Sequence, residues 1–246
     1  MLKYVILLII LINVGKAVQA QSYTIESFEG IPQKINVTCD GENLTITCFR
    51  DTIHITDFND FPEGATLLNN NFLKVVYDAR GGTGLHLTHT LLLCVNNQKL
   101  YQAIHITSVF NEEFIDYSKK VDPANPVAER SRYELFLNLT GSSKEDYKLT
   151  IHIHDERKSK EPHRTNYNKN SQTVLKFNKL LNIFYSKYER VSNRFTVFDP
   201  KTYDEGKQYV SGNFPVVRLG AYDYYIIKGE WYEKDDHNNL TKYSYK

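Results

Sequence analysis

The sequence is poor in the residues that mark several common protein classes. It has three cysteines, one methionine and one tryptophan among 246 residues, with 12 glycines and 7 prolines. Basic and acidic residues number 30 and 29, so the formal net charge is only +1. A near-neutral chain offers no electrostatic reason to bind nucleic acid or an anionic membrane. We therefore expect no nucleic-acid partner.

Long apolar runs are also lacking, except at the N-terminus. The run YVILLIILINV there is too short to span a bilayer, which takes about 20 apolar residues, and Lys16 follows it closely. The segment ends with the small residues Val18 and Ala20, as cleaved signal peptides do. We predict that residues 1–20 are a signal peptide cut after Ala20. The mature product would be secreted or periplasmic, with no membrane span.

Three cysteines are too few for a disulfide framework and cannot all pair within one chain. Cys39 and Cys48 fall on the two strands of a predicted hairpin. Its register separates them by about 13 Å, whereas a disulfide tolerates Cα separations of only about 7 Å. Cys94 lies in a very apolar segment, where a thiol is usually inert. We expect buried free thiols, and neither a cysteine nucleophile nor a zinc site.

The chain is rich in β-forming residues, including 18 tyrosines and 13 phenylalanines. Short runs alternate in polarity and are separated by turn residues. This pattern predicts an all-β protein, an antiparallel β-sandwich or barrel-like fold of about eleven strands with long polar loops. Similar Ile-rich segments near residues 52, 103 and 150 leave blade-like repeats, with a period near 50, as an alternative.

We assign residues 21–246 to a single β-rich domain. The stretch 155–172 has almost no apolar residues and is predicted to be a mobile surface loop. Residues 237–246 are expected to be a loose C-terminal tail. Segment 173–191 fits either an amphipathic helix or a hairpin, and its aromatic and β-branched second half favours the hairpin.

The stretch YDARGGTGLHLTHTLLLCV, residues 77–95, combines glycines, histidines and a cysteine. A phosphate-binding loop needs a helix behind its glycines, whereas the residues that follow here alternate as a strand. Apolar residues have odd numbers on both sides of the glycines, so a hairpin loop of three or five residues is predicted. Gly81, Gly82 or Gly84 should then have a positive φ.

The polar face of this hairpin and of the next strand is the candidate binding site. We expect Thr90 to lie opposite His105, which puts eight polar residues on one face. His89 would point the other way, as a core histidine. The predicted binding patch consists of Lys74, Asp78, Arg80, His86, Thr88, Thr90, His105 and Thr107. The alternative is an ordinary solvated sheet face.

No sequence motif indicates catalysis, a cofactor or a metal. Gly-x-Ser-x-Gly and Gly-Lys-Ser/Thr are absent, and His152 with His154 lacks a visible third ligand. We therefore predict no catalytic residue, cofactor or metal. The favoured function is a non-enzymatic binding or interaction module for an unknown protein or glycan, in the cell envelope or outside the cell.

The alternative function is an extracytoplasmic hydrolase that acts on polysaccharide. Such an enzyme needs two carboxylates about 5 to 10 Å apart in a cleft. Acids such as Glu112 and Glu113 are scattered, and the sequence assigns no pair of them to one inward face.

Overall fold

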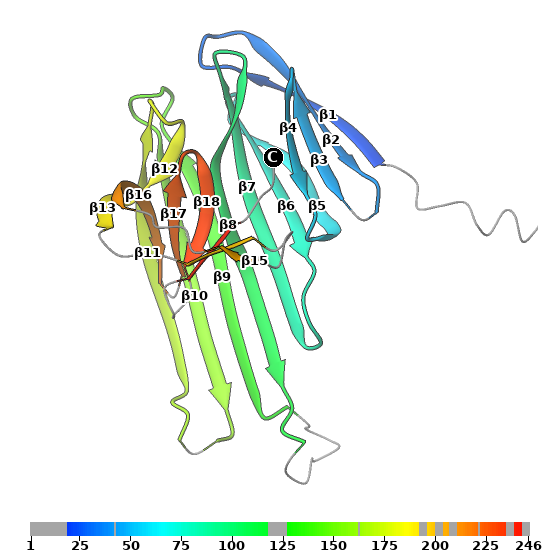
Figure 1. The fold of residues 1–246 in the computed structure, drawn as a ribbon, viewed down its shortest axis with the longest axis vertical. Coiled ribbons are helices and arrows are strands. Elements are labelled where there is room, and N and C mark those ends of the chain that lie inside the picture. The colour runs from blue at the N-terminus through cyan, green and yellow to red at the C-terminus, as the bar shows by residue number, and fades with distance from the viewer. Residues whose placement is uncertain are drawn as a thin grey trace, which may run out of the picture.

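The protein consists of β-strands, and the part of the chain that the structure describes contains no helix. This computed structural model describes residues 19–41, 43–117, 127–161, 163–191, 196–199, 204–206, 211–220, 222–234 and 239–242. Its strands form three sheets (Figure 1). The predicted all-β, sandwich-like class is confirmed, although nineteen strands lie in the described residues instead of about eleven.

The first sheet is a four-stranded antiparallel meander at the N-terminal end of the described chain. Burial alternates along β3, in the pattern expected of strands with one face on a core. Its strands are β1 (Gln19–Glu26), β2 (Pro32–Cys39), β3 (Leu44–Cys48) and β4 (Asp51–Ile55).

The central sheet has eight antiparallel strands, each paired with its neighbour in the chain. Its longest strand, β8, has 16 residues. The strands are β5 (Phe58–Leu68), β6 (Phe72–Ala79), β7 (Leu85–Asn96), β8 (Lys99–Phe114), β9 (Glu129–Thr140), β10 (Lys148–Ser159), β11 (Tyr167–Asn178) and β12 (Ile183–Tyr185).

The third sheet has the order β13-β16-β17-β18-β19-β14-β15 and includes one parallel pair, β14 with β19. Its strands are β13 (Lys187–Val191), β14 (Thr196–Asp199), β15 (Asp204–Gly206), β16 (Gly212–Leu219), β17 (Tyr222–Ile227), β18 (Glu230–Lys234) and β19 (Asn239–Lys242).

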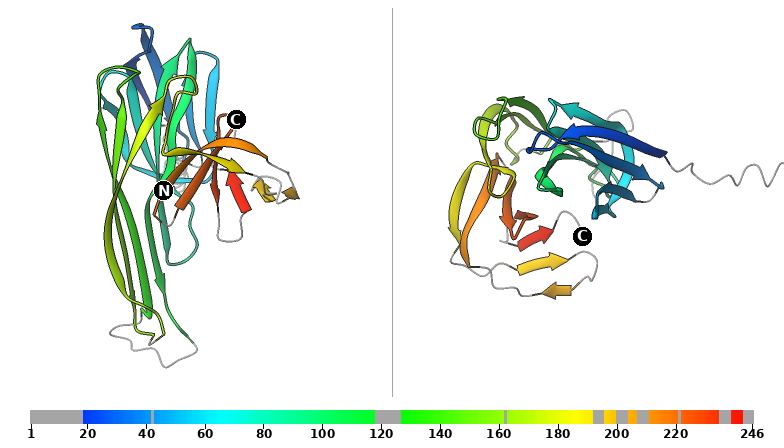
Figure 2. Two further views of the ribbon diagram at one scale, coloured as in Figure 1. Left: turned by 90° about the vertical axis from the view of Figure 1, so that its left-hand side faces the viewer. Right: turned by 90° about the horizontal axis from the view of Figure 1, so that it is seen from above.

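The first and third sheets pack on opposite faces of the β7–β8 region. On β7, Leu91 and Leu93 join a core cluster with the first sheet. Leu92 and Cys94 point the other way and join the cluster that includes the third sheet. Figure 2 shows the two smaller sheets apart from each other, each against a different part of the central sheet. Burial on both sides explains the unbroken apolar run in β7.

The far halves of β8 to β11 extend beyond the third sheet and form an arm, seen at the bottom of Figure 1. The residues of the arm are 110–114, 129–133, 155–159 and 167–171. Side chains alternate between two faces along each strand. We call the face on the side of the third sheet the inner face and the opposite one the outer face.

Several predictions about segments are resolved by these strands. Segment 173–191 is not a helix, because β11 ends at Asn178 and β12 begins at Ile183. Stretch 155–172, predicted as a loop, instead lies mostly in β10 and β11 of the arm. Its polarity reflects strands that extend beyond the hydrophobic core. Asn239–Lys242, predicted as loose tail, is strand β19.

The prediction for the glycine loop is confirmed, and the prediction for the cysteines is confirmed in part. Cys39, Cys48 and Cys94 are free thiols, but only Cys48 and Cys94 are buried, and Cys39 is half-buried. The β6–β7 pairing includes Leu73 opposite Leu93, and residues 80–84 form a five-residue loop. Gly84 has a φ of 81°, which is the positive value expected of one of the three glycines.

Gly84 should not tolerate a side chain. A Cβ there would lie 2.6 Å from the backbone oxygen of Glu113, in addition to the strained φ. We expect Gly84→Val to lower the free energy of unfolding by roughly 1–3 kcal/mol or more, measured by urea denaturation. Gly82→Ala is the matched control, because a Cβ at Gly82 meets nothing within 4 Å. Equal stability of both variants would contradict this account of the loop.

Candidate functional site

The structure brings together only part of the predicted binding patch. Thr88 donates a hydrogen bond of 2.7 Å to Asp78, and His86 Nε2 lies 3.7 Å from the same carboxylate. Arg80 lies beyond the end of β6 and donates to the backbone oxygen of Phe58 at 3.1 Å. Lys74 is half-buried and Thr90 is buried.

His105 and Thr107 are not on that face, because two β-bulges change the register of β8. Leu93 lies opposite Gln102 but Leu92 lies opposite Ile104, so Ala103 is an extra residue. His105 therefore pairs with Leu91 and not with Thr90. A one-residue shift reverses which face each side chain occupies. A second bulge after Thr107 restores the original alternation.

The reversed residues form a buried polar cluster under the first sheet. The His105 ring contacts the Tyr77 hydroxyl at 2.9 Å and the Gln102 amide oxygen at 3.1 Å. His89, predicted as a core histidine, is only 5% exposed. Its Nδ1 lies 3.3 Å from the Thr107 hydroxyl.

In this cluster a carboxylate, an imidazole and a hydroxyl lie next to one another in space, as in a catalytic triad. A substrate could not reach them. Asp57 lies 3.7 Å from His89 Nε2, on the far side of the ring from Thr107. Thr107 is only 2% exposed, so its hydroxyl is not presented to a substrate. Burial lowers the pKa of His89 to about 3 and also lowers that of His105. Both rings are therefore neutral packing groups at neutral pH.

A cleft on the inner face of the arm is the stronger candidate site. Strand pairing sets Phe110, Tyr133 and Asp155 in one row across β8, β9 and β10. A second row contains Glu112, Ser131, Arg157 and Tyr167. The third sheet contributes the opposite wall, with Tyr222, Glu233 and Lys234, and the enclosed volume is about 380 Å³.

Aromatic rings fix the geometry where the two sheets meet. The ring of Tyr222 packs edge-on to Tyr133, with centroids 4.8 Å apart, and lies 6.4 Å from Phe110. Tyr133 is anchored because its hydroxyl donates to the backbone oxygen of Leu219 at 2.7 Å. On the arm, the guanidinium of Arg157 lies 5.5 Å from the ring centre of Tyr167. Aromatic side chains thus line both walls of the cleft.

Three carboxylates converge on this cleft. Burial raises the pKa of Tyr222, and the negative charges of Glu233, Asp155 and Glu112 raise it further. All three acids line the same cleft as Tyr222. Burial raises the pKa of Tyr167, and the negative charge of the nearby Asp155 carboxylate raises it further. The arrangement can offer hydrogen-bond acceptors, a cation and ring faces to one polar ligand.

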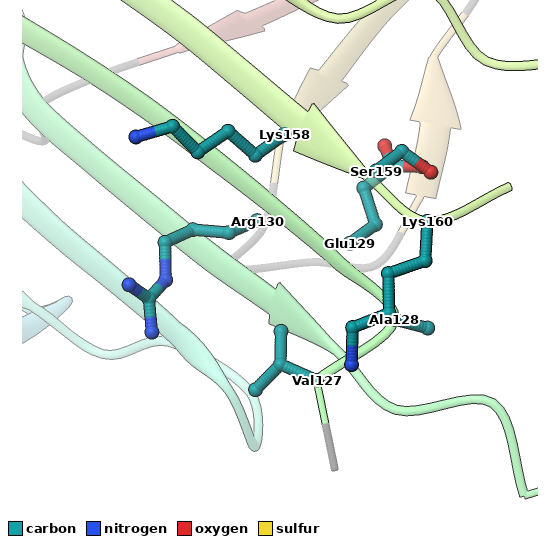
Figure 3. Close-up of a pocket in the computed structure, with 7 residues that line it drawn as sticks. All are labelled: Val127, Ala128, Glu129, Arg130, Lys158, Ser159 and Lys160. Carbon is teal, nitrogen blue, oxygen red and sulfur yellow. The ribbon is translucent and has the colours of Figure 1, made fainter. Parts of the chain in front are cut away.

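The tip of the arm carries a smaller hollow of about 280 Å³ near Val127 and Lys160 (Figure 3). Arg130 and Lys158 point to one side of the strands, and Glu129 and Ser159 to the other. Arg130 is paired with Glu113 at 2.5 Å, and Lys158 with Glu156 at 2.7 Å. Both cations are already paired and no aromatic ring is among the described residues that line the hollow, so it is a weaker site than the cleft.

Sequence reasoning missed the cleft. Its residues come from segments that the sequence does not connect, such as Glu112, Tyr167 and Tyr222. The available signal was the aromatic end of the chain, residues 222–232. The structure buries Tyr224 and Trp231 completely in the core, whereas Tyr222 is half-buried and lines the cleft.

The remaining candidates do not form sites in the described part of the chain. No group of three or more histidines, cysteines or acids there could hold a metal. His154 contacts Asn170 at 2.9 Å, and His152 is exposed. Burial raises the pKa of the Cys94 thiol far above its usual range. Within the same residues, no helix has the length and apolarity needed to cross a bilayer.

Comparisons with known proteins add no functional information. No protein-family model matches the chain, and neither the curated proteins nor the solved structures include a match. The function must therefore be inferred from the geometry of the molecule.

The buried histidines predict that the fold loses stability in acid. The unfolded chain binds protons to histidine near pH 6.5 and folded His89 only near pH 3, so stability falls as the pH drops below about 6.5. We expect the neutral state of His89 in the fold to lower the free energy of unfolding by about 2 kcal/mol at pH 5 relative to pH 7.5. Urea denaturation of the native protein and of His89→Gln at both pH values measures this cost.

The variant should lose less stability than the native protein on acidification. Burial raises the pKa of Asp57 to about 6, and Arg80 opposes that shift, so Asp57 acts in the opposite direction. Asp57 is present in both proteins, so the difference between them reports His89 together with its contact to Asp57. Identical pH dependence in the two proteins would mean that His89 has the same pKa in the fold as in the unfolded chain.

Proposed function

We propose that this protein is a non-enzymatic binding module that acts outside the cytoplasm and recognises an oligosaccharide in the cleft of the arm. The observation that carries the proposal is the contrast between the two faces of the arm. On the outer face, charges pair with each other across strands, as in Arg130 with Glu113. On the inner face, Arg157 is paired with Glu129 at 3.4 Å, but aromatic rings and further carboxylates stand beside this pair and line a cleft of about 380 Å³.

The chemistry of the cleft suits a sugar. Pyranose rings combine an apolar face with a rim of hydroxyl groups. Tyrosine rings, such as those of Tyr167 and Tyr222, present a flat apolar surface with a polar end. Carboxylates and guanidinium groups, such as Asp155 and Arg157, make strong charge-assisted hydrogen bonds to hydroxyls. All four side chains stand on paired strands, which hold a site more firmly than loops do.

A specific observation also favours the alternative, a polysaccharide hydrolase. Glu112 and Asp155 stand on the arm, and Glu233 faces them from the third sheet. Two carboxylates on opposite sides of a glycosidic bond are what general acid and nucleophile or base require. We rank binding first, because none of the three acids is buried.

The N-terminal segment supports the location outside the cytoplasm. We expect the purified native protein to begin at Gln21 when its N-terminus is sequenced. Cleavage there would keep the pairs of β1 from Gln21 opposite Val37 to Glu26 opposite Pro32. A native protein that retains Met1 and sediments with membranes would contradict this prediction.

The binding proposal predicts that inner-face aromatics matter and outer-face aromatics do not. An array of plant, microbial and animal oligosaccharides identifies a binding sugar, which is then titrated calorimetrically. We expect Tyr167→Ala to weaken binding at least tenfold, because a central aromatic contact commonly contributes more than 1 kcal/mol. Phe136→Ala is the matched control, since Phe136 lies on the outer face of β9 and is 61% exposed.

Two outcomes would count against the binding module. If Tyr167→Ala and Phe136→Ala bind the sugar equally well, the cleft is not the site. If the native protein releases new reducing ends from the sugar and Glu112→Gln stops this release, the hydrolase replaces the binding module.

A further inference from the structure

A second hollow lies at the end of the molecule remote from the arm, where the turns of three hairpins meet (Figure 1). It has a volume of about 450 Å³, within the range of about 300–1,000 Å³ typical of small-molecule sites. Its walls come from the β3–β4, β11–β12 and β17–β18 turns and from the beginnings of β4, β8 and β12. It is therefore independent of the cleft in position and in composition.

The hollow combines an apolar wall with a cationic rim. Leu100 and Ile183 are buried in the wall, while Leu181 and the 85% exposed Leu180 extend it towards solvent. The rim carries three exposed cations, Arg50, Lys99 and Lys228.

The charge on this rim is unbalanced. Asp51 is the one acid among the lining residues, and its carboxylate accepts the Leu100 backbone N–H at 2.8 Å. Lys99 lies 5.5 Å from the centre of the Tyr101 ring. In the described part of the chain, neither Arg50 nor Lys228 has an ion-pair partner. The rim thus attracts a negative group next to an apolar wall.

The backbone conformation of the rim follows from its tight turns. Lys228 and Phe49, the neighbour of Arg50, both have a φ of 53°. Each lies in a two-residue hairpin turn, which needs positive φ at one or both of its central positions. The turns place Arg50 and Lys228 at the tips of hairpins, where both side chains are exposed at the rim.

We propose that this hollow binds an amphiphilic anion, a molecule with a carboxylate or phosphate head group and a hydrocarbon tail. Arg50, Lys99 and Lys228 hold the head group. The tail lies against Leu100, Leu181 and Ile183. The near-neutral charge of the whole chain means that this attraction is local and acts only at short range. The ligand comes either from solution, as a single amphiphile, or from the surface of an anionic bilayer.

The test uses laurate, below its micelle concentration, as the soluble probe and octyl glucoside as its uncharged counterpart. Calorimetric titration should show binding of laurate by the native protein and at least tenfold weaker binding of octyl glucoside. Sedimentation with phosphatidylcholine vesicles, with and without phosphatidylglycerol, tests the bilayer as the source. Binding to the anionic vesicles alone assigns the ligand to the membrane and supports the proposal in that form.

Two substitutions at Lys228 separate ligand binding from folding. Lys228→Gln removes the charge and should weaken binding of the anionic probe at least fivefold. The control is Lys34→Gln, which removes an exposed lysine of β2 and should leave binding unchanged. Lys228→Gly should weaken binding equally while leaving the melting temperature unchanged or higher, since it relieves the strained φ. The proposal would be overturned if the native protein bound neither laurate nor anionic vesicles. It would also be overturned if both Lys228 variants bound the probe as the native protein does, or if Lys228→Gly melted at a lower temperature.

Discussion

Burial of both faces of the β7–β8 hairpin is the constraint on which the rest of the structure depends. Leu91 and Leu93 lie on one face of β7, and Leu92 and Cys94 lie on the other. Both faces are apolar, so one further sheet could bury only one of them. The first and third sheets supply the two covers. Backbone groups near the bulges of β8 gain partners from the third sheet, where Trp231 donates to the Gln102 oxygen at 3.0 Å and the Tyr224 hydroxyl accepts from Thr107 at 3.2 Å. These hydrogen bonds hold the third sheet in a fixed position on the central sheet. The cleft lies where the third and central sheets diverge.

Much of the fold follows from the sequence because strand periodicity is a local signal. The β6–β7 register and the hairpin at 173–191 depend on residues close together in the chain, and both predictions are confirmed. Stretch 155–172 was misinterpreted because polarity usually marks loops. Here it marks strands whose two faces both meet solvent or the cleft, as in Asn168 and Ser171.

The candidate site was harder to anticipate, for two physical reasons. First, the bulge at Ala103 carries no sequence signature, because Ile104, His105 and Ile106 alternate acceptably in either register. It moved His105 from the predicted patch into the core. Second, the cleft depends on how the third sheet lies against the arm. That placement is set by tertiary contacts such as Tyr133 with Leu219, between residues far apart in the chain.

The strand order also has a consequence for how the molecule assembles. Every pair in the first and central sheets joins neighbours in the chain, so these sheets can form hairpin by hairpin as synthesis proceeds. The third sheet cannot form wholly in this way, because Thr196 on β14 pairs with Asn239 on β19. Leu149, Ile151 and Leu175 on the inner face of the central sheet are covered by β16, β17 and β18, through residues such as Tyr224 and Trp231. This face of the central sheet therefore stays exposed until β18 has been synthesised, and a nascent chain is most prone to aggregation in that interval.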